Sequence, residues 1–234
     1  TRRIDWRVAA GELGARLREI ELARSVYGTG REPPGGRQGR GHRGAGEELC
    51  TWHVSCAAAG DFRPQLVFAA DRDFASSDDL FGLYTSRREA LRSLRTLADA
   101  HQLCHRQLGL EEGSREGACA AYRQKNCRGV CIGREAPALH GARLLSALAK
   151  FRLKIWPYRG PVVLVERDEF GMREDLHLID RWRLVGTVGS EEELHAVLAD
   201  GPSTGPFDPD VYRILSRFLQ AGRLPLRQLS PCSG

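Results

Sequence analysis

Four cysteines in the middle of the chain restrict how this region can fold. Cys104, Cys119, Cys127 and Cys131 follow the pattern C-x14-C-x7-C-x3-C. Four thiolates are the ligand set that a tetrahedral Zn²⁺ ion or an iron–sulfur cluster needs. Gly129, between the last two cysteines, lets the backbone turn without the steric cost of a Cβ atom. We predict that the four sulfur atoms converge on one metal centre; the alternative is a set of unrelated thiols on a helix and a loop.

Two histidines stand beside the first of these cysteines. His101 and His105 are spaced i, i+4 next to Cys104, so a mixed Cys/His zinc site is conceivable. Histidines also occur near helix C-termini because the helix dipole favours their positive charge there. The surface interpretation is the simpler one for this pair.

The charge of the chain favours an anionic partner. The net charge is +5 and the sequence pI is about 9.0, with lysine only at positions 125, 150 and 154. Guanidinium groups bind phosphate oxygens in pairs, so an arginine-rich surface suits nucleic acid. A genome of high G+C content is an alternative explanation, because it raises the arginine content without any relation to function. Three basic residues next to the last cysteines are our candidates for DNA contacts: Arg123, Lys125 and Arg128.

Cysteine usage and hydropathy favour a reducing compartment such as the cytoplasm. The seven cysteines are odd in number, and no apolar signal stretch opens the chain, which argues against a secreted disulfide framework. Cys50 and Cys56 flank a strand-like run and are expected to be core or free thiols, and Cys232 is expected in an exposed tail. No apolar run approaches the ~20 residues that span a bilayer, so we expect no membrane partner.

The order of local signals predicts an α+β fold. Runs that alternate apolar and polar residues predict one hairpin after residue 47, and PVVLVER with DLHLIDRWRLV predicts another. Capping boxes at Ser86 and Ser190, and an Asp–Pro pair at Asp208, mark helix starts. The expected segments are a helix at 1–27, a glycine- and arginine-rich disordered linker at 28–46, a ββα unit at 47–103, the cysteine cluster at 104–133, an α/β region at 134–221 and a tail at 222–234.

The first predicted helix has two stripes. Leu13, Leu17 and Ile20 form an apolar stripe, and Glu12, Arg16 and Glu19 form a charged stripe beside it. A solvated ladder of salt bridges accounts for the charged stripe at little energy per pair. The chain contains no G-x-S-x-G, H-E-x-x-H or Walker motif and no complete catalytic constellation. It begins at Thr1 and its only methionine is Met172, so we expect a piece of a longer protein.

The cysteine segment CAAYRQKNCRGVCIG resembles that of the UvrC and Cho family of DNA excision-repair endonucleases. LFGLYTSRREAL and FDPDVYRILSRFL resemble the Cho-like branch, which includes fusions to a polymerase III epsilon-type exonuclease. Together these likenesses cover most of residues 47–221. The resemblance implies a 4Fe–4S cluster, where spacing alone leaves zinc open. It rests most specifically on Cys104, Cys119, Tyr122, Gln124, Cys127, Gly129 and Cys131.

The same resemblance extends to the first helix. GELGARLRE is similar to the last helix of a GIY-YIG nuclease domain, which implies that Glu19 descends from a carboxylate that holds Mg²⁺ or Mn²⁺. The GIY and YIG strands, with the tyrosine and arginine of that site, lie upstream of this helix in the family and are missing here. A lone glutamate cannot hold the metal and orient water, so this chain alone is expected not to cut DNA.

The resemblance thus predicts the C-terminal part of a Cho-like endonuclease that binds damaged double-stranded DNA and an iron–sulfur cluster. It also implies a UvrB-like partner that loads the enzyme at damage. A zinc-binding DNA-binding or adaptor module without a nuclease half, and a truncated product without activity, are the alternatives.

Overall fold

The chain folds into two compact units, each described here by itself. The computed structural model describes residues 6–27, 49–56, 60–111, 117–199, 207–222 and 224–229. One unit comprises Arg43–Ile155, and the other combines Thr1–His42 with Trp156–Gly234. The glycine- and arginine-rich segment predicted as a linker lies outside the described residues, as does Cys232. The α+β class predicted from the sequence is confirmed.

A three-stranded antiparallel sheet forms the base of the Arg43–Ile155 unit. The predicted hairpin is β1 (Cys50–Cys56) paired with β2 (Phe62–Phe68), in a register that sets Cys50 opposite Phe68. β3 (Leu80–Tyr84) adds to the other edge of β1, giving the order β2-β1-β3. Cys50 is buried and Cys56 is exposed.

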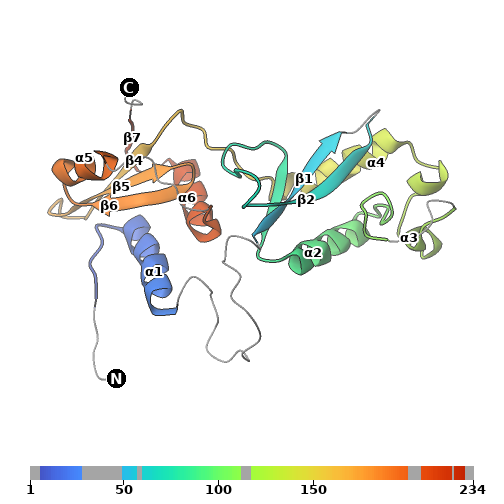
Figure 1. The fold of residues 1–234 in the computed structure, drawn as a ribbon, viewed down its shortest axis with the longest axis horizontal. Helices are drawn as coiled ribbons and strands as arrows, with labels where there is room; N and C mark the ends of the chain where they lie inside the picture. The colour runs from blue at the N-terminus through green and yellow to red at the C-terminus, as the bar shows by residue number, and fades with distance from the viewer. Residues whose placement is uncertain are drawn as a thin grey trace. The chain divides into compact units, whose positions relative to one another are not determined.

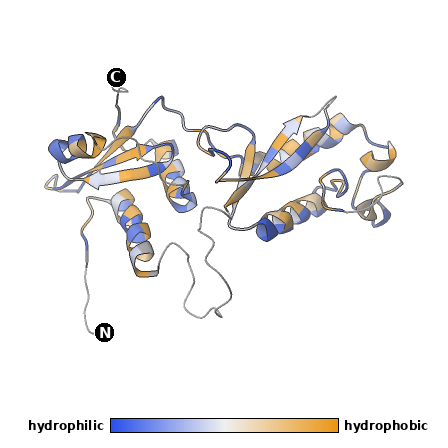
Figure 2. Ribbon diagram, viewed as in Figure 1, coloured by the Kyte–Doolittle hydropathy of each residue, from blue (hydrophilic) through white to orange (hydrophobic). Residues whose placement is uncertain are grey.

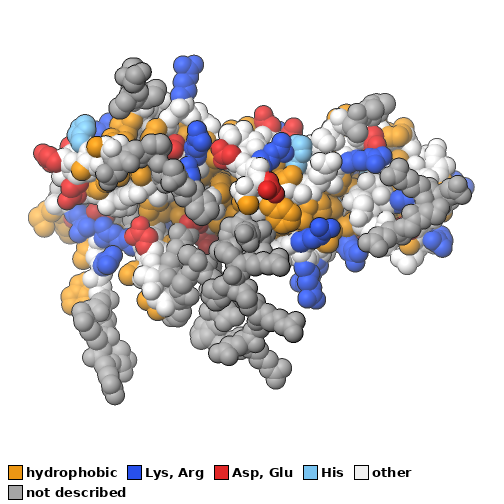
Figure 3. All heavy atoms as spheres, viewed as in Figure 1, with side chains coloured by type: hydrophobic (Ala, Val, Ile, Leu, Met, Phe, Trp, Pro, Cys, Tyr) orange, Lys and Arg blue, Asp and Glu red, His pale blue; other side chains and the backbone are white. Residues whose placement is uncertain are grey.

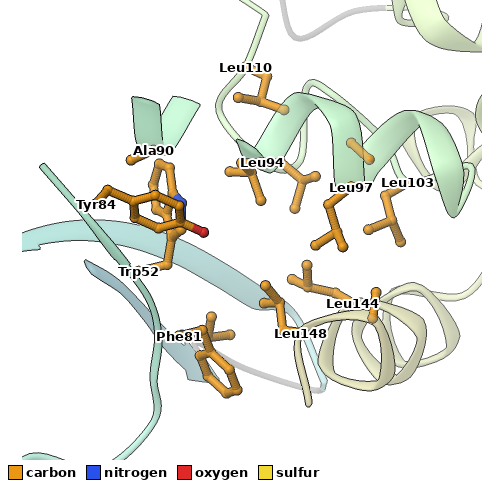
Figure 4. Close-up of a cluster of buried hydrophobic side chains, with 14 of the residues drawn as sticks. Trp52, Phe81, Tyr84, Ala90, Leu94, Leu97, Leu103, Leu110, Leu144 and Leu148 are labelled. Atoms are coloured by element: carbon orange, nitrogen blue, oxygen red, sulfur yellow. The ribbon is translucent and has the colours of Figure 1, made fainter. Parts of the chain in front are cut away.

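Two helices cover one face of this sheet and build the core (Figure 4). α2 (Arg87–Ala100) and α4 (Pro137–Leu148) face each other through leucines, of which Leu94 and Leu144 are almost fully buried. Ser86 accepts the amide hydrogen of Glu89, so the predicted capping box is confirmed. The short 3-10 helix η2 (Ala149–Phe151) follows α4.

The other unit is built on a four-stranded antiparallel sheet with the order β6-β5-β4-β7. Its strands are β4 (Val162–Arg167), β5 (Glu174–Asp180), β6 (Arg183–Val188) and β7 (Leu226–Gln228). The helices are α1 (Glu12–Tyr27), α5 (Glu191–Ala199) and α6 (Pro209–Ala221). Figure 1 shows α5 on one side of the sheet and α1 with α6 on the other, and Figure 2 shows apolar residues concentrated on the strands.

The predicted hairpin of PVVLVER and DLHLIDRWRLV forms as β4 paired with β5, but its second segment is not one continuous strand. β5 ends at Asp180, and Arg181 and Trp182 have φ angles of +48° and +63°, which make a tight turn into β6. Trp182 is only 2% exposed and packs edge-to-face on Trp156 and Tyr212. Burial of a large aromatic side chain therefore stabilises a turn that normally needs asparagine or glycine.

The predicted starts of α5 and α6 are confirmed. Ser190 accepts the amide hydrogen of Glu193, and Asp208 caps α6 with Pro209 in its first turn. The segment predicted as a tail from Gly222 onward contains β7, which pairs with β4. No helix in the described part of the chain is both long and apolar enough to cross a membrane.

Candidate metal centre

The four cysteine sulfur atoms converge as predicted. All four Sγ atoms lie within 4.8 Å of one another, and the Sγ atoms of Cys104 and Cys119 are 3.7 Å apart. Bonds of ~2.3 Å from a tetrahedral Zn²⁺ to its sulfur ligands separate those ligands by ~3.8 Å. The sulfur atoms thus surround a space of the size that one metal ion needs.

Short elements between the core helices hold the cysteines. Cys104 follows α2, and Cys119 caps the single-turn helix α3 (Ala120–Arg123), where its Sγ accepts the Tyr122 amide hydrogen at 3.3 Å. Cys127 precedes a turn, and Cys131 lies in the 3-10 helix η1 (Val130–Ile132). The first three cysteines are buried and Cys131 is partly exposed. Any bound metal would therefore be largely shielded from water.

The turn after Cys127 needs a glycine. Gly129 has a φ angle of +92°, and a Cβ atom there would lie 3.0 Å from atoms of Tyr122 and of Arg134. Its amide hydrogen points to the Cys127 sulfur, with an N to Sγ distance of 3.3 Å. An amide hydrogen directed at sulfur stabilises a thiolate. The same residue therefore supplies both the bend and a hydrogen bond to a ligand.

Burial opposes ionisation of the inner thiols. Burial, with a smaller contribution from the neighbouring cysteines, raises the pKa of Cys104 and raises that of Cys127 to about 11. Burial also acts to raise the pKa of Cys131, but hydrogen bonds from the backbone and side chain of Cys119, and from the other two thiols, lower it overall. A bound metal cation would supply the positive charge that allows all four thiols to ionise, and its binding would release protons.

His140, which the sequence analysis did not single out, supports the first ligand. Its Nε2 accepts the backbone N–H of Cys104 at 3.0 Å, and the side chain is buried. Acceptance at Nε2 requires a neutral ring with its proton on Nδ1, and burial, which lowers the pKa of His140, favours that form. Its spacing of i, i+4, i+8 with Leu144 and Leu148 was the available signal, because it puts the ring on the buried face of α4.

An arginine of α4 fixes the end of α2 just before Cys104. Arg143 donates two hydrogen bonds to the carboxylate of Glu135, at 2.9 and 2.6 Å. The same guanidinium donates to the backbone carbonyl of His101 at 2.6 Å. The bond to His101 joins α4 to the C-terminal end of α2, and the bidentate contact to Glu135 holds the guanidinium in place.

The two histidines considered as zinc ligands are not brought into the site. His105 contacts Asp99 at 2.9 Å, and His101 is exposed. Among the described residues, the group that could hold a metal consists of the four cysteines only. The surface interpretation of these histidines agrees with this arrangement.

The candidate DNA-contacting residues Arg123, Lys125 and Arg128 are all exposed beside the cysteines. Arg128 donates to the side chain of Gln102 at 3.3 Å. No carboxylate of the described residues lies within ion-pairing distance of any of the three. Their charge is therefore available to an anion from solution.

Glu19 is exposed on α1, in the unit that does not contain the four cysteines. Arg16, placed between two carboxylates in the sequence prediction, pairs with Glu12 at 2.7 Å. No second acidic or histidine cluster completes a metal site around Glu19 within the described residues. Its descent from a catalytic carboxylate stays a prediction.

The start of α1 is held by two buried carboxylates of the four-stranded sheet. Glu166 accepts the amide hydrogens of Leu13 and Gly14 at 2.9 and 2.7 Å, and Asp175 accepts that of Ala10 at 2.8 Å. These contacts satisfy amide groups that a helix N-terminus leaves unpaired. The helix predicted to belong to a nuclease domain thus packs within the same unit as residues 156–234.

Comparisons with known proteins agree with this architecture. Residues 50–150 match the family model described as the UvrC/Cho excinuclease middle domain, and residues 161–233 match the Excinuclease Cho C-terminal domain. Excinuclease Cho of Escherichia coli K12 is 34% identical over 233 residues, which are 100% of this chain and 72% of that protein. Excinuclease Cho of Salmonella typhi is 36% identical over 228 residues, covering 97% of this chain and 71% of the relative. No solved structure matches the chain significantly. The chain belongs to the UvrC/Cho excinuclease family.

Proposed function

We propose that residues 1–234 form the DNA-binding and cluster-binding part of a DNA excision-repair endonuclease. The observation that carries this proposal is the convergence of four cysteine sulfur atoms within 4.8 Å, beside exposed basic residues that have no carboxylate partner among the described residues. Membership in a family of excinucleases supports DNA as the partner. The basic residues would bind phosphate oxygens without reading base sequence.

We propose a 4Fe–4S cluster as the group that Cys104, Cys119, Cys127 and Cys131 hold. The four-thiolate donor set fits such a cluster, which would supply a rigid, covalently anchored centre for this loop-rich segment. The described residues around it would position the thiolates and shield them from water. The sequence resemblance, rather than the geometry, favours iron over zinc.

One observation favours zinc as the second candidate. Sulfur atoms within 4.8 Å of one another suit a single tetrahedral ion directly. A four-iron cluster binds each thiolate to a different iron, so the sulfur atoms would have to move apart. The chain would then be a zinc-containing DNA-binding or adaptor module.

Metal analysis after anaerobic purification separates the two candidates. We expect about four irons and four sulfides per chain with broad absorbance at about 400 nm; one zinc per chain and a colourless protein would establish the alternative. Cys127→Ser should lose the metal. Cys56→Ser is the matched control, because Cys56 is an exposed thiol outside the cysteine group.

We further propose that Glu19 contributes a carboxylate to a Mg²⁺ or Mn²⁺ site in the intact nuclease. The described residues supply no companion ligands, so we expect residues 1–234 alone not to nick supercoiled plasmid. Robust nicking that Glu19→Ala abolishes, while Glu12→Ala does not, would contradict this expectation. The UvrB-like partner stays a prediction from the resemblance.

A further inference from the structure

The outer face of α2 carries a stripe of exposed arginines. Arg88, Arg92 and Arg95 are spaced i, i+4, i+7, which places them along one side of the helix. The opposite side packs into the core through Leu94 and Leu97, among others. The stripe is therefore fixed in direction by the core and faces solvent.

This arrangement costs the helix stability. Like charges at i, i+3 and i, i+4 are each unfavourable by about 0.2–0.5 kcal/mol. Arg87 and Arg88 also stand in the first turn, where the helix dipole disfavours positive charge. The last turn, where the dipole favours basic residues, has none. The electrostatics of α2 itself therefore do not account for this placement.

The stripe has no internal counter-ion among the described residues. Carboxylates pair with arginines elsewhere in both units, as in Arg63–Asp61 and Arg213–Asp210. No carboxylate of the described part of the chain pairs with Arg88, Arg92 or Arg95.

The two acidic residues of α2 are engaged elsewhere. Glu89 accepts hydrogen bonds from the backbone and the hydroxyl group of Thr85, both at 2.8 Å. Asp99, which ends the stripe, pairs with His105. The positive charge of the stripe is thus not neutralised from within its own helix.

Contacts connect the stripe to the cysteine segment. Arg95 donates to the backbone carbonyl of Leu110 at 3.3 Å, and Gln102, just after α2, accepts a hydrogen bond from Arg128 at 3.3 Å. In Figure 3, basic side chains gather over α2 and beside the cysteine segment, with few acidic ones among them. The stripe and the candidate DNA-contacting residues therefore lie on connected parts of one unit.

We propose that Arg88, Arg92 and Arg95 bind the phosphate backbone of duplex DNA and extend the contact made by the cysteine segment. This inference rests on the proposed function. The stripe is ~10 Å long at ~1.5 Å per helical residue. One DNA strand carries a phosphate every ~3.4 Å along the axis, so about three phosphates match three guanidinium groups. The contact is independent of base sequence because it reaches only the backbone.

The test compares two triple variants with the same change in charge. The first is Arg88→Gln/Arg92→Gln/Arg95→Gln. The control is Arg167→Gln/Arg213→Gln/Arg227→Gln, which removes exposed arginines that already have carboxylate partners. Binding of a fluorescent duplex of about 20 base pairs is measured by anisotropy from about 0.05 to 0.3 M salt. We expect the α2 variant to reduce the slope of log K against log salt by about 2–3 and the affinity at about 0.1 M salt on the order of 100-fold. The control variant should change neither the salt slope nor the affinity appreciably.

The outcomes separate this inference from the proposed function. If the unmodified chain does not bind duplex DNA, the proposed function and this inference both fail. If it binds and Arg123→Gln/Lys125→Gln/Arg128→Gln weakens binding, but the α2 variant keeps the full slope, this inference alone is overturned. Unchanged metal content and a midpoint of thermal unfolding equal to or above that of the unmodified chain establish that the α2 variant is folded. The single variant Arg92→Glu, expected to reduce the slope by about 1 or more, repeats the test with one substitution.

Discussion

Replacement of Glu166 by glutamine tests how α1 is attached to the four-stranded sheet. The Glu166 side chain is 6% exposed and accepts the amide hydrogens of Leu13 and Gly14. Glutamine has nearly the same shape, but it offers one acceptor oxygen, and its NH₂ group would face the other amide. Each hydrogen bond to a charged group contributes about 1.5–3 kcal/mol, and an unsatisfied buried donor adds a penalty. We expect Glu166→Gln to destabilise the attachment of α1 by about 2–4 kcal/mol.

Hydrogen exchange of the α1 amides measures this attachment directly. A loss of about 2–4 kcal/mol corresponds to exchange that is roughly 30-fold to 1000-fold faster in residues 10–27. Glu12→Gln is the matched control on the same helix, because the Glu12 side chain is 64% exposed and pairs with Arg16. That pair contributes about 0.5 kcal/mol at most. Equal exchange rates in the two variants would refute the role of Glu166 as the group that holds α1.

Two further predictions concern the cysteine turn and pH. Gly129→Ala should lose bound metal, whereas Gly133→Ala, with a φ angle of +74° and no atom near its added Cβ, should retain more of it in elemental analysis. Burial lowers the pKa of His177 from 6.5, so the unfolded chain binds its proton at higher pH than the folded chain does. Stability of the four-stranded unit, followed by tryptophan fluorescence in urea, should therefore fall as the pH drops below about 6.5, by up to ~1.4 kcal/mol per pH unit, and His177→Gln should flatten this dependence. The charged groups that face the His177 ring are Glu166, Asp175 and Arg18.

Local chemistry determines which parts of the fold could be predicted from the sequence. The capping residues Ser86, Ser190 and Asp208 act on amides two or three positions away, so their motifs predict helix starts without tertiary information. The β1–β2 hairpin follows from its alternating pattern. The cysteine site was predictable because four thiols so close in sequence match the number and type of ligands that a metal centre needs.

The features that the sequence analysis missed depend on contacts between distant residues. Glu166 meets α1 across more than 150 positions, and a carboxylate in an apolar strand gives no sign of its partner. His140 reaches Cys104 only because α4 packs against α2. The turn at Trp182 contradicts local turn propensity, since its stabilisation comes from aromatic residues elsewhere in the unit. Tertiary packing determines all three.

Two buried clusters among the described residues of the Arg43–Ile155 unit indicate what a metal would contribute to folding. The larger cluster joins α2, α4 and the sheet through leucine and aromatic side chains. The smaller cluster consists of the cysteines with Ala121, and only Tyr122 and Val130 add apolar surface. So few apolar groups bury too little area to offset the conformational entropy of ordering residues 117–133. Metal–thiolate bonds would supply the missing stabilisation, so the exposed basic residues of this segment would keep their positions beside α2 only while the metal is bound.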